Sequence, residues 1–133
     1  MQALKARVTR GLQVGTWLPT CDNSGASMIK IVSVINMKTS QRRVPYCGVG
    51  DLVLAAVKKG KPEMRKQVVY AVIVRQKKEY RRPDGMRICF EDNAAVVLKD
   101  EKGNPKGTIF KGPIAKEAAS RWPPVSKVAS IIV

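Results

Sequence analysis

Residues 71–97 read AVIVRQKKEYRRPDGMRICFEDNAAVV, and this stretch decides the fold. Both of its ends are apolar and rich in β-branched side chains, which favour strands. The middle carries six Lys and Arg residues against only Glu79 and Asp84. Within it, Pro83-Asp84-Gly85 has the residue types of a tight turn. The pattern predicts a β-hairpin with two strands rooted in a core and a basic arm projecting from them.

The chain as a whole is strongly basic. Its 133 residues favour one domain, 1–133, and 25 Lys+Arg against 10 Asp+Glu give a formal net charge of +15. Such a charge attracts polyanions. A membrane surface is the weaker candidate partner, because no apolar run approaches the roughly 18–20 residues of a spanning helix. We therefore expect a nucleic acid as partner, and no membrane.

The cysteines are Cys21, Cys47 and Cys89, which lie far apart, and the chain has no histidine. A zinc site is therefore disfavoured, and we expect neither a metal nor a cofactor. An odd number of cysteines also disfavours a disulfide framework, so the sequence indicates a reducing compartment with free thiols. We expect Cys21 and Cys89, in or beside strands, to react slowly, and Cys47, in a loop, to react fastest. Residues 1–10 lack the apolar centre of a secretory signal and suggest a short arm or an edge strand.

Turn signals divide the rest of the chain into short strands. Strands are expected over residues 11–20, 26–36, 52–57, 68–74, 86–90 and 94–98. The pattern becomes helical over 114–121, with Pro113 in the first turn and Pro123-Pro124 as the stop, and a second short helix or a strand follows over 125–132. The fold class is therefore mainly β. We expect a small closed barrel over about 11–110 and a C-terminal helical region over about 113–133.

Two motifs that could carry chemistry have simpler interpretations. Gly48-x-Gly50 is a plain turn, because Val53 stands where a dinucleotide fingerprint needs its third glycine. Asp84, Glu91 and Asp92 could hold magnesium in an RNA-processing enzyme. Adjacent strand residues point to opposite faces, however, so we expect Asp84 to make the turn and the other two to pair with arginines. We expect no enzymatic activity.

Three basic clusters are the candidate RNA-binding residues. Few aromatic residues accompany them, so recognition of the backbone and shape of folded RNA is favoured over base stacking on a platform. The clusters are Lys38, Arg42 and Arg43; Lys58, Lys59, Lys61, Arg65 and Lys66; and Arg75, Lys77, Lys78, Arg81, Arg82 and Arg87. A free RNA-binding regulator remains an alternative to a structural role in a ribonucleoprotein particle.

The spacing of the opening stretch resembles the signature of the universal large-subunit ribosomal protein family numbered fourteen. The matching positions are Ala71-Val72-Ile73-Val74, Asp84-Gly85, Phe90, Asn93 and Val96-Val97, together with Asp22-Asn23-Ser24-Gly25-Ala26. The segments Lys58–Glu63 and Arg121-Trp122-Pro123 resemble the archaeal and eukaryotic branch. The resemblance runs from about Gly11 to the end of the sequence.

This resemblance implies a five-stranded β-barrel with a projecting β-ribbon and a C-terminal loop and helix region. It implies a structural, cytoplasmic role in the large ribosomal subunit, with binding to large-subunit rRNA near the face that meets the small subunit. It further implies bridges to small-subunit rRNA, contacts with neighbouring ribosomal proteins and docking of the anti-association initiation factor.

The C-terminal segment is the candidate surface for protein contacts. It is Ala-rich and poor in basic residues from Ile114 onward, so it is poorly suited to bind a phosphate backbone. Trp122 is either a core plug or a docking anchor, since a large aromatic serves both purposes. The proposed protein-contact residues are Ser120, Trp122, Ser126 and Lys127.

Overall fold

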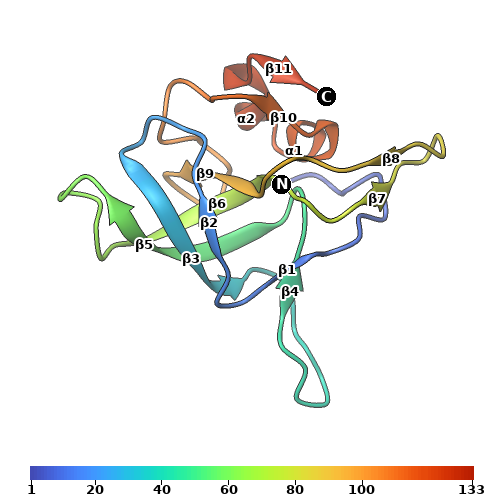
Figure 1. Cartoon of the computed structure of the whole chain (residues 1–133), viewed down its shortest axis with the longest axis horizontal. Helices are drawn as coiled ribbons and strands as arrows, with labels where there is room; N and C mark the ends of the chain where they lie inside the picture. Colours follow the sequence, from blue (N-terminus) through green and yellow to red (C-terminus); the bar gives the residue numbers. More distant parts are fainter.

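The computed structural model describes residues 1–133, and its centre is a five-stranded antiparallel sheet in the order β2-β3-β5-β6-β9 (Figure 1). The fold is mainly β, as the sequence indicates. The strands of this sheet are β2 (Trp17–Pro19), β3 (Ala26–Val34), β5 (Leu52–Gly60), β6 (Val68–Arg75) and β9 (Ala94–Leu98).

The hairpin expected from residues 71–97 is present and is rooted in this sheet. Ala71 pairs with Val97 and Val72 with Val96, so the two apolar ends lie side by side in β6 and β9. The basic segment between them leaves the sheet as a ribbon, in which β7 (Tyr80–Arg81) pairs with β8 (Arg87–Ile88). Figure 1 shows this ribbon projecting from the body of the molecule.

The two outer strands of the sheet, β2 and β9, meet at one point. Thr20, just after β2, forms an isolated parallel bridge with Ala95, and the Cys21 N–H donates to the Ala95 carbonyl at 3.0 Å. No continuous ladder joins the two strands. The closed barrel expected from the sequence is therefore not confirmed, and the fold is described as an open five-stranded sheet with this single bridge.

Three of the expected strands are shorter or divided in the structure: those over 26–36 and 86–90 are shorter, and the one over 11–20 is divided. The strand expected over 11–20 is split into β1 (Leu12–Gln13) and β2, because Gly15 between them has a φ of 93°. Such a φ is left-handed and suits a turn rather than a strand. The separated β1 pairs with β4 (Tyr46–Cys47) beside the main sheet.

The C-terminal region contains two short helices, α1 (Lys116–Arg121) and α2 (Pro123–Val128). The expected helix is confirmed, but Pro123-Pro124 begins a second helix as well as ending the first, because proline fits the first turn of a helix. Pro113 lies in β10 (Pro113–Ile114), which pairs in parallel with β11 (Ile131–Ile132). Neither helix is long and apolar enough to cross a membrane.

The core consists of two apolar clusters that share strand β6. Val72 and Val74 belong to one cluster, together with Trp122 of the C-terminal region. Ala71 and Ile73 belong to the other, and all four strand residues are 0% exposed. Successive residues of a strand point to opposite faces, so a continuous apolar run such as 71–74 indicates a strand covered on both sides.

The Trp122 side chain is part of this core. It is 0% exposed, and its indole Nε1–H donates to the Gly50 carbonyl at 2.8 Å. Its ring also packs against Gly103, where an added Cβ would come within 2.5 Å of the ring. The interpretation of Trp122 as a core plug is confirmed, and its assignment as a protein-docking residue is wrong.

The positions of two cysteines differ from expectation. Cys21 is buried as predicted, but Cys47 is also buried, because it lies in β4 opposite Leu12. Cys89 is exposed, because it follows the short strand β8 on the projecting ribbon. All three thiols are free.

Candidate nucleic-acid interface

The three basic clusters lie on three separate projections of the fold. Figure 1 shows the loop between β3 and β4 at the bottom, the turn between β5 and β6 at the left and the β7–β8 ribbon at the right. Each projection extends beyond the main sheet, and apart from a few buried residues such as Met64 and Tyr80 its side chains are not part of the core. The clusters therefore form three spaced sites rather than one continuous patch.

The loop between β3 and β4 presents Lys38, Arg42 and Arg43, all of them exposed. Its tip is a tight turn in which the Arg43 N–H donates to the Ser40 carbonyl at 3.3 Å. Gln41 and Arg42, the two central residues, have φ values of 57° and 59°. Two successive left-handed residues define a type I′ turn, which usually contains Asn and Gly. The two side chains are thus held outward at the cost of backbone strain.

The end of β5 and the turn that follows it carry five basic residues against one acidic residue, Glu63. The buried residue Met64 holds the turn against the body of the protein, and the Lys61 N–H donates to the Gly25 carbonyl at 2.9 Å. The five cations of this projection, two at the end of β5 and three in the turn, are exposed, and none forms an ion pair. They are Lys58, Lys59, Lys61, Arg65 and Lys66.

The ribbon presents Lys77, Lys78 and Arg81, which are exposed and have no acidic partner. Arg87 is also exposed, but its Nη1 lies 2.9 Å from Glu79 Oε1. An exposed pair of this kind is weak, so Arg87 can exchange this carboxylate for a phosphate. These four side chains are placed where RNA can reach them.

Arg75 does not belong to the exposed arm. It is 8% exposed, and its guanidinium binds the Asp92 carboxylate at 3.0 and 3.2 Å. It also donates to the carbonyls of Lys111 at 3.1 Å and Pro113 at 2.9 Å. All of these partners lie within the protein. Arg75 was expected among the RNA-binding residues, but a bidentate carboxylate holds its guanidinium inside the protein, away from a phosphate.

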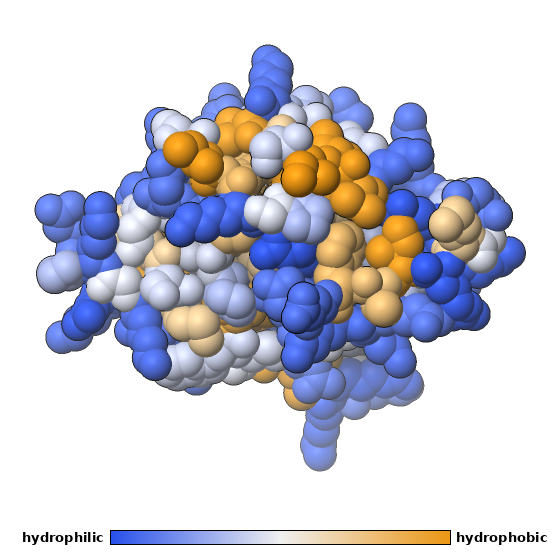
Figure 2. All heavy atoms as spheres, turned by 45° about the horizontal axis from the view of Figure 1, so that its top comes forward, coloured by the Kyte–Doolittle hydropathy of each residue, from blue (hydrophilic) through white to orange (hydrophobic).

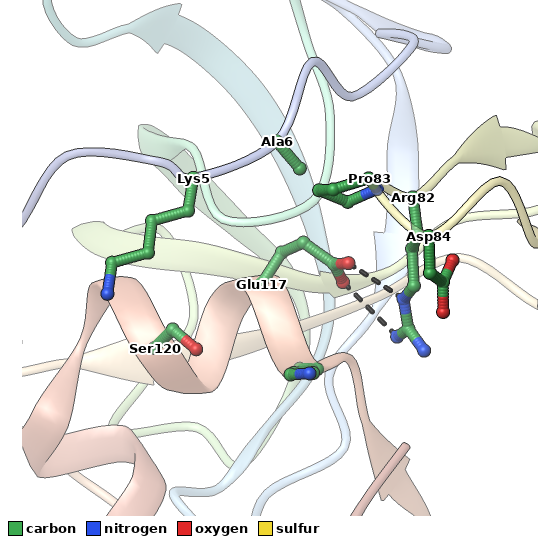
Figure 3. A pocket seen from close by; sticks show the side chains of 8 residues that line it. Lys5, Ala6, Arg82, Pro83, Asp84, Glu117 and Ser120 are labelled. Carbon is green, nitrogen blue, oxygen red and sulfur yellow. Dashed lines mark hydrogen bonds and ion pairs between the residues drawn. The ribbon is translucent and has the colours of Figure 1, made fainter.

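Arg82 is also occupied within the protein. Its Nε lies 2.8 Å from Oε1 of Glu117 on α1, and its Nη2 lies 3.3 Å from Oε2 (Figure 3). The Tyr80 hydroxyl donates to the same carboxylate at 2.8 Å. Burial and the hydrogen bond to Glu117 both raise the pKa of Tyr80, so it remains a hydrogen-bond donor at neutral pH. Arg82 thus fixes the root of the ribbon and is not a free cation.

The three acidic candidates have separate surroundings. Asp84 makes the ribbon turn, since its Oδ1 accepts a bond from the Met86 N–H at 2.9 Å. Asp92 pairs with Arg75, as expected, whereas Glu91 has no ion-pair partner. No group of three His, Cys, Asp or Glu side chains is arranged so that it could hold a metal ion.

Sequence reasoning left the basic residues of the first ten positions unassigned. The structure packs this segment against the body through the buried Val8 and through the Gln76 amide, whose Nε2 donates to the Thr9 carbonyl at 2.6 Å. Lys5, Arg7 and Arg10 remain exposed along it. The sequence indicated only that these residues are basic. The apolar pattern of residues 1–10 was too weak to predict how the segment packs.

The C-terminal segment presents a different kind of surface. Ser120 and Lys127 are exposed and Ser126 is half-buried. Beside them, Ile131 and Ile132 are 55% and 46% exposed. Figure 2 turns this end of the molecule toward the viewer and shows apolar surface there among hydrophilic side chains. This end is thus less polar than the three basic projections.

Comparison with known proteins agrees with these features. The family described as ribosomal protein L14p/L23e matches residues 11–133. The large ribosomal subunit protein uL14 of Nanoarchaeum equitans is 52% identical over 133 residues, covering 100% of both chains. The uL14 of Picrophilus torridus is 50% identical over the same length and coverage. Both organisms are archaea, in agreement with the branch indicated by the sequence. The chain belongs to the ribosomal protein L14p/L23e family.

Proposed function

We propose that this protein is a structural constituent of the large ribosomal subunit in the cytoplasm and binds rRNA through its three basic projections. The observation that carries this proposal is that most of their Lys and Arg side chains are exposed and have no acidic partner. Unpaired surface cations cluster in this way where a phosphate backbone replaces the missing counter-charges. The family of the chain supports the same assignment.

The arrangement favours recognition of RNA shape. The projections point in different directions, so they suit several segments of a folded RNA better than one helix. Large-subunit rRNA supplies such segments. Contacts with small-subunit rRNA at intersubunit bridges, near the face where the subunits meet, belong to the same proposal and rest on the family resemblance.

The interface proposed for proteins is the C-terminal end. Ser120, Ser126 and Lys127 lie there beside exposed apolar side chains, which suit a protein partner better than RNA. We assign this surface to neighbouring ribosomal proteins and to the anti-association initiation factor. A charge reversal at Lys127 combined with Ser126→Glu is expected to reduce binding of the factor and leave rRNA binding intact.

The experiment that tests the RNA interface is the salt dependence of binding to large-subunit rRNA. Each phosphate contact that is lost reduces the slope of log affinity against log salt by a little under one. Replacing Lys58, Lys59 and Lys61 by Gln is therefore expected to lower this slope by about two to three. The matched control replaces the same number of exposed lysines outside the projections, namely Lys99, Lys102 and Lys111.

Equal slopes for the two triple variants would contradict the proposal, because only total charge would then matter. A free regulator is distinguished by sedimentation at high salt. A structural subunit protein remains with the large subunit under these conditions, whereas a regulator is released.

A further inference from the structure

A groove lies between the N-terminal segment and strand β4, outside the three basic projections. It has a volume of about 490 Å³ and is lined mainly by Leu4, Arg7, Val8, Arg10, Tyr46 and Val49. In Figure 1 the N-terminal segment runs between β1 and the ribbon. Tyr46 directly follows the loop that carries Arg42 and Arg43. The groove is therefore located between two of the proposed RNA-binding projections.

The floor of the groove is apolar, whereas its exposed lining is mainly polar and its rim is cationic. Val8 and Val49 are 9% and 1% exposed and form part of the core beneath it. Arg7 is exposed and makes no ion pair. A concave site in which a few polar groups converge over an apolar floor can hold a small ligand. A ligand with a flat apolar part and an anionic part would match it.

Tyr46 and Arg10 supply the flat surface. The Tyr46 ring is 40% exposed, although its neighbour Cys47 is buried. The guanidinium carbon of Arg10 lies 5.7 Å from the ring centroid. A guanidinium and an aromatic ring placed in this way form a stacked pair on which a nucleobase can add a further layer.

The acidic residue in the groove does not repel an anion. The Asp51 carboxylate accepts a bond from the Gly48 N–H at 2.9 Å and pairs with Arg121 at 3.0 Å. It also lies 3.5 Å from Nε of Arg10. Its charge is therefore compensated from inside the protein, and Arg7 is left as the free charge at the rim.

We propose that this groove binds one unpaired nucleotide of an RNA, with the base against Tyr46 and the phosphate on Arg7. The inference rests on the proposed function and adds to it a site that reads an exposed base. The exposed Tyr46 ring favours RNA over an acidic peptide, because it offers a stacking surface for a base, and the groove adjoins other unpaired cations.

The test uses a short single-stranded oligoadenylate and an abasic oligonucleotide with the same number of phosphates. Tyr46→Ala is expected to weaken binding of the oligoadenylate about tenfold and to leave the abasic oligonucleotide unaffected. Tyr46→Phe keeps the ring and is expected to keep the affinity, which excludes a folding defect as the cause. Arg7→Gln is expected to lower the salt slope for both probes by about one. Tyr70→Ala, at a half-exposed tyrosine elsewhere, is the matched control.

Three results would overturn the inference. One is an unchanged affinity of Tyr46→Ala for oligoadenylate while the Lys58, Lys59 and Lys61 variant loses rRNA affinity, which would leave the proposed function intact. Another is an equal loss for both probes, which would mark a phosphate contact without a base. The third is a polyglutamate peptide that shifts the Tyr46 ring resonances more than oligoadenylate does, which would make the groove a protein site. Failure of the proposed function itself would appear separately, as an unchanged salt slope in the lysine variant.

Discussion

Nε of Arg82 lies 2.8 Å from Oε1 of Glu117, although 35 residues separate them in sequence. The two side chains are 15% and 7% exposed. The pair joins the root of the ribbon to helix α1. It connects the part of the molecule proposed to bind RNA with the part proposed to bind protein, so the position of each depends on the other.

Glu117→Gln is expected to destabilise the protein by about 3 kcal/mol, because it leaves the charge of Arg82 without its partner in a largely buried place. Urea unfolding measures this change. The matched control is Glu79→Gln, which breaks the pair with Arg87 on the ribbon, where the side chains are 50% and 64% exposed. That variant is expected to lose less than about 1 kcal/mol. Equal losses would show that the Arg82–Glu117 pair has no special structural role.

Trp122→Ala is expected to cost about 3–5 kcal/mol, since it removes a large buried side chain and leaves a cavity. It also leaves the Gly50 carbonyl without the indole donor. Trp17 is the control, because it is 48% exposed and its replacement by Ala is expected to change stability by no more than about 0.5 kcal/mol. Thermal unfolding distinguishes the two. A stable Trp122→Ala variant would contradict the core assignment.

Cys89 is expected to react with a thiol reagent fast and completely in the folded protein, whereas Cys21 and Cys47 react only after unfolding. Mass spectrometry of partly labelled, digested protein identifies the modified residue. Burial raises the pKa of Cys21 to about 11 and that of Cys47 to about 12, so neither is a thiolate at neutral pH. Early labelling of Cys47 would show that β4 opens readily.

The same two thiols give stability a pH dependence in the alkaline range. Burial is the main cause that raises their pKa from 9.0 to about 11 and about 12. The unfolded chain therefore loses these protons first, so stability is constant below about pH 9 and falls above it, by roughly 1 kcal/mol per thiol per pH unit. Cys47→Ala removes one of the two thiols, so it is expected to reduce the loss of stability by roughly 1 kcal/mol per pH unit. Identical alkaline slopes for the variant and the parent would refute this origin.

A relaxed turn at the tip of the β3–β4 loop is expected to raise the stability of the protein and to lower its affinity for RNA. Gln41→Asn with Arg42→Gly replaces two strained left-handed residues by the usual type I′ pair, and it is expected to stabilise the protein by about 1 kcal/mol. It also removes one proposed phosphate contact, so rRNA affinity should fall. Chemical denaturation and filter binding measure the two effects. A gain in affinity would exclude Arg42 from the interface.

Local patterns in the sequence were sufficient to locate the main strands. The apolar run 71–74 and the segment 94–98 correspond closely to β6 and β9, because strands covered on both faces need continuous apolar residues. The ribbon turn followed from Pro83-Asp84-Gly85. The division of the first strand at Gly15 was missed, since a glycine in a strand pattern does not show which sign of φ it adopts.

For the candidate site, the sequence predicted correctly that basic residues in loops are exposed. It did not predict which basic residues pair with acidic residues inside the protein. Arg75 and Arg82 look like the other basic residues of the ribbon, but their partners Asp92 and Glu117 are 17 and 35 residues away. A pairing over such distances is set by the tertiary fold and leaves no local signal. Cys47 and Cys89 were misplaced for the same reason, since two-residue strands carry too little pattern to show which face is covered.

Strand β6 presents alternate residues to the two halves of the core, and this fixes the register of its pairing. A slip of one residue in its pairing would exchange Val72 and Val74 with Ala71 and Ile73, and the small and large side chains would then meet the wrong partners on both faces at once. A shifted register is therefore unfavourable on both faces of the strand. The ribbon continues directly from this strand, so its direction is already fixed in the folded protein, and the proposed binding of RNA would require little further ordering of the chain.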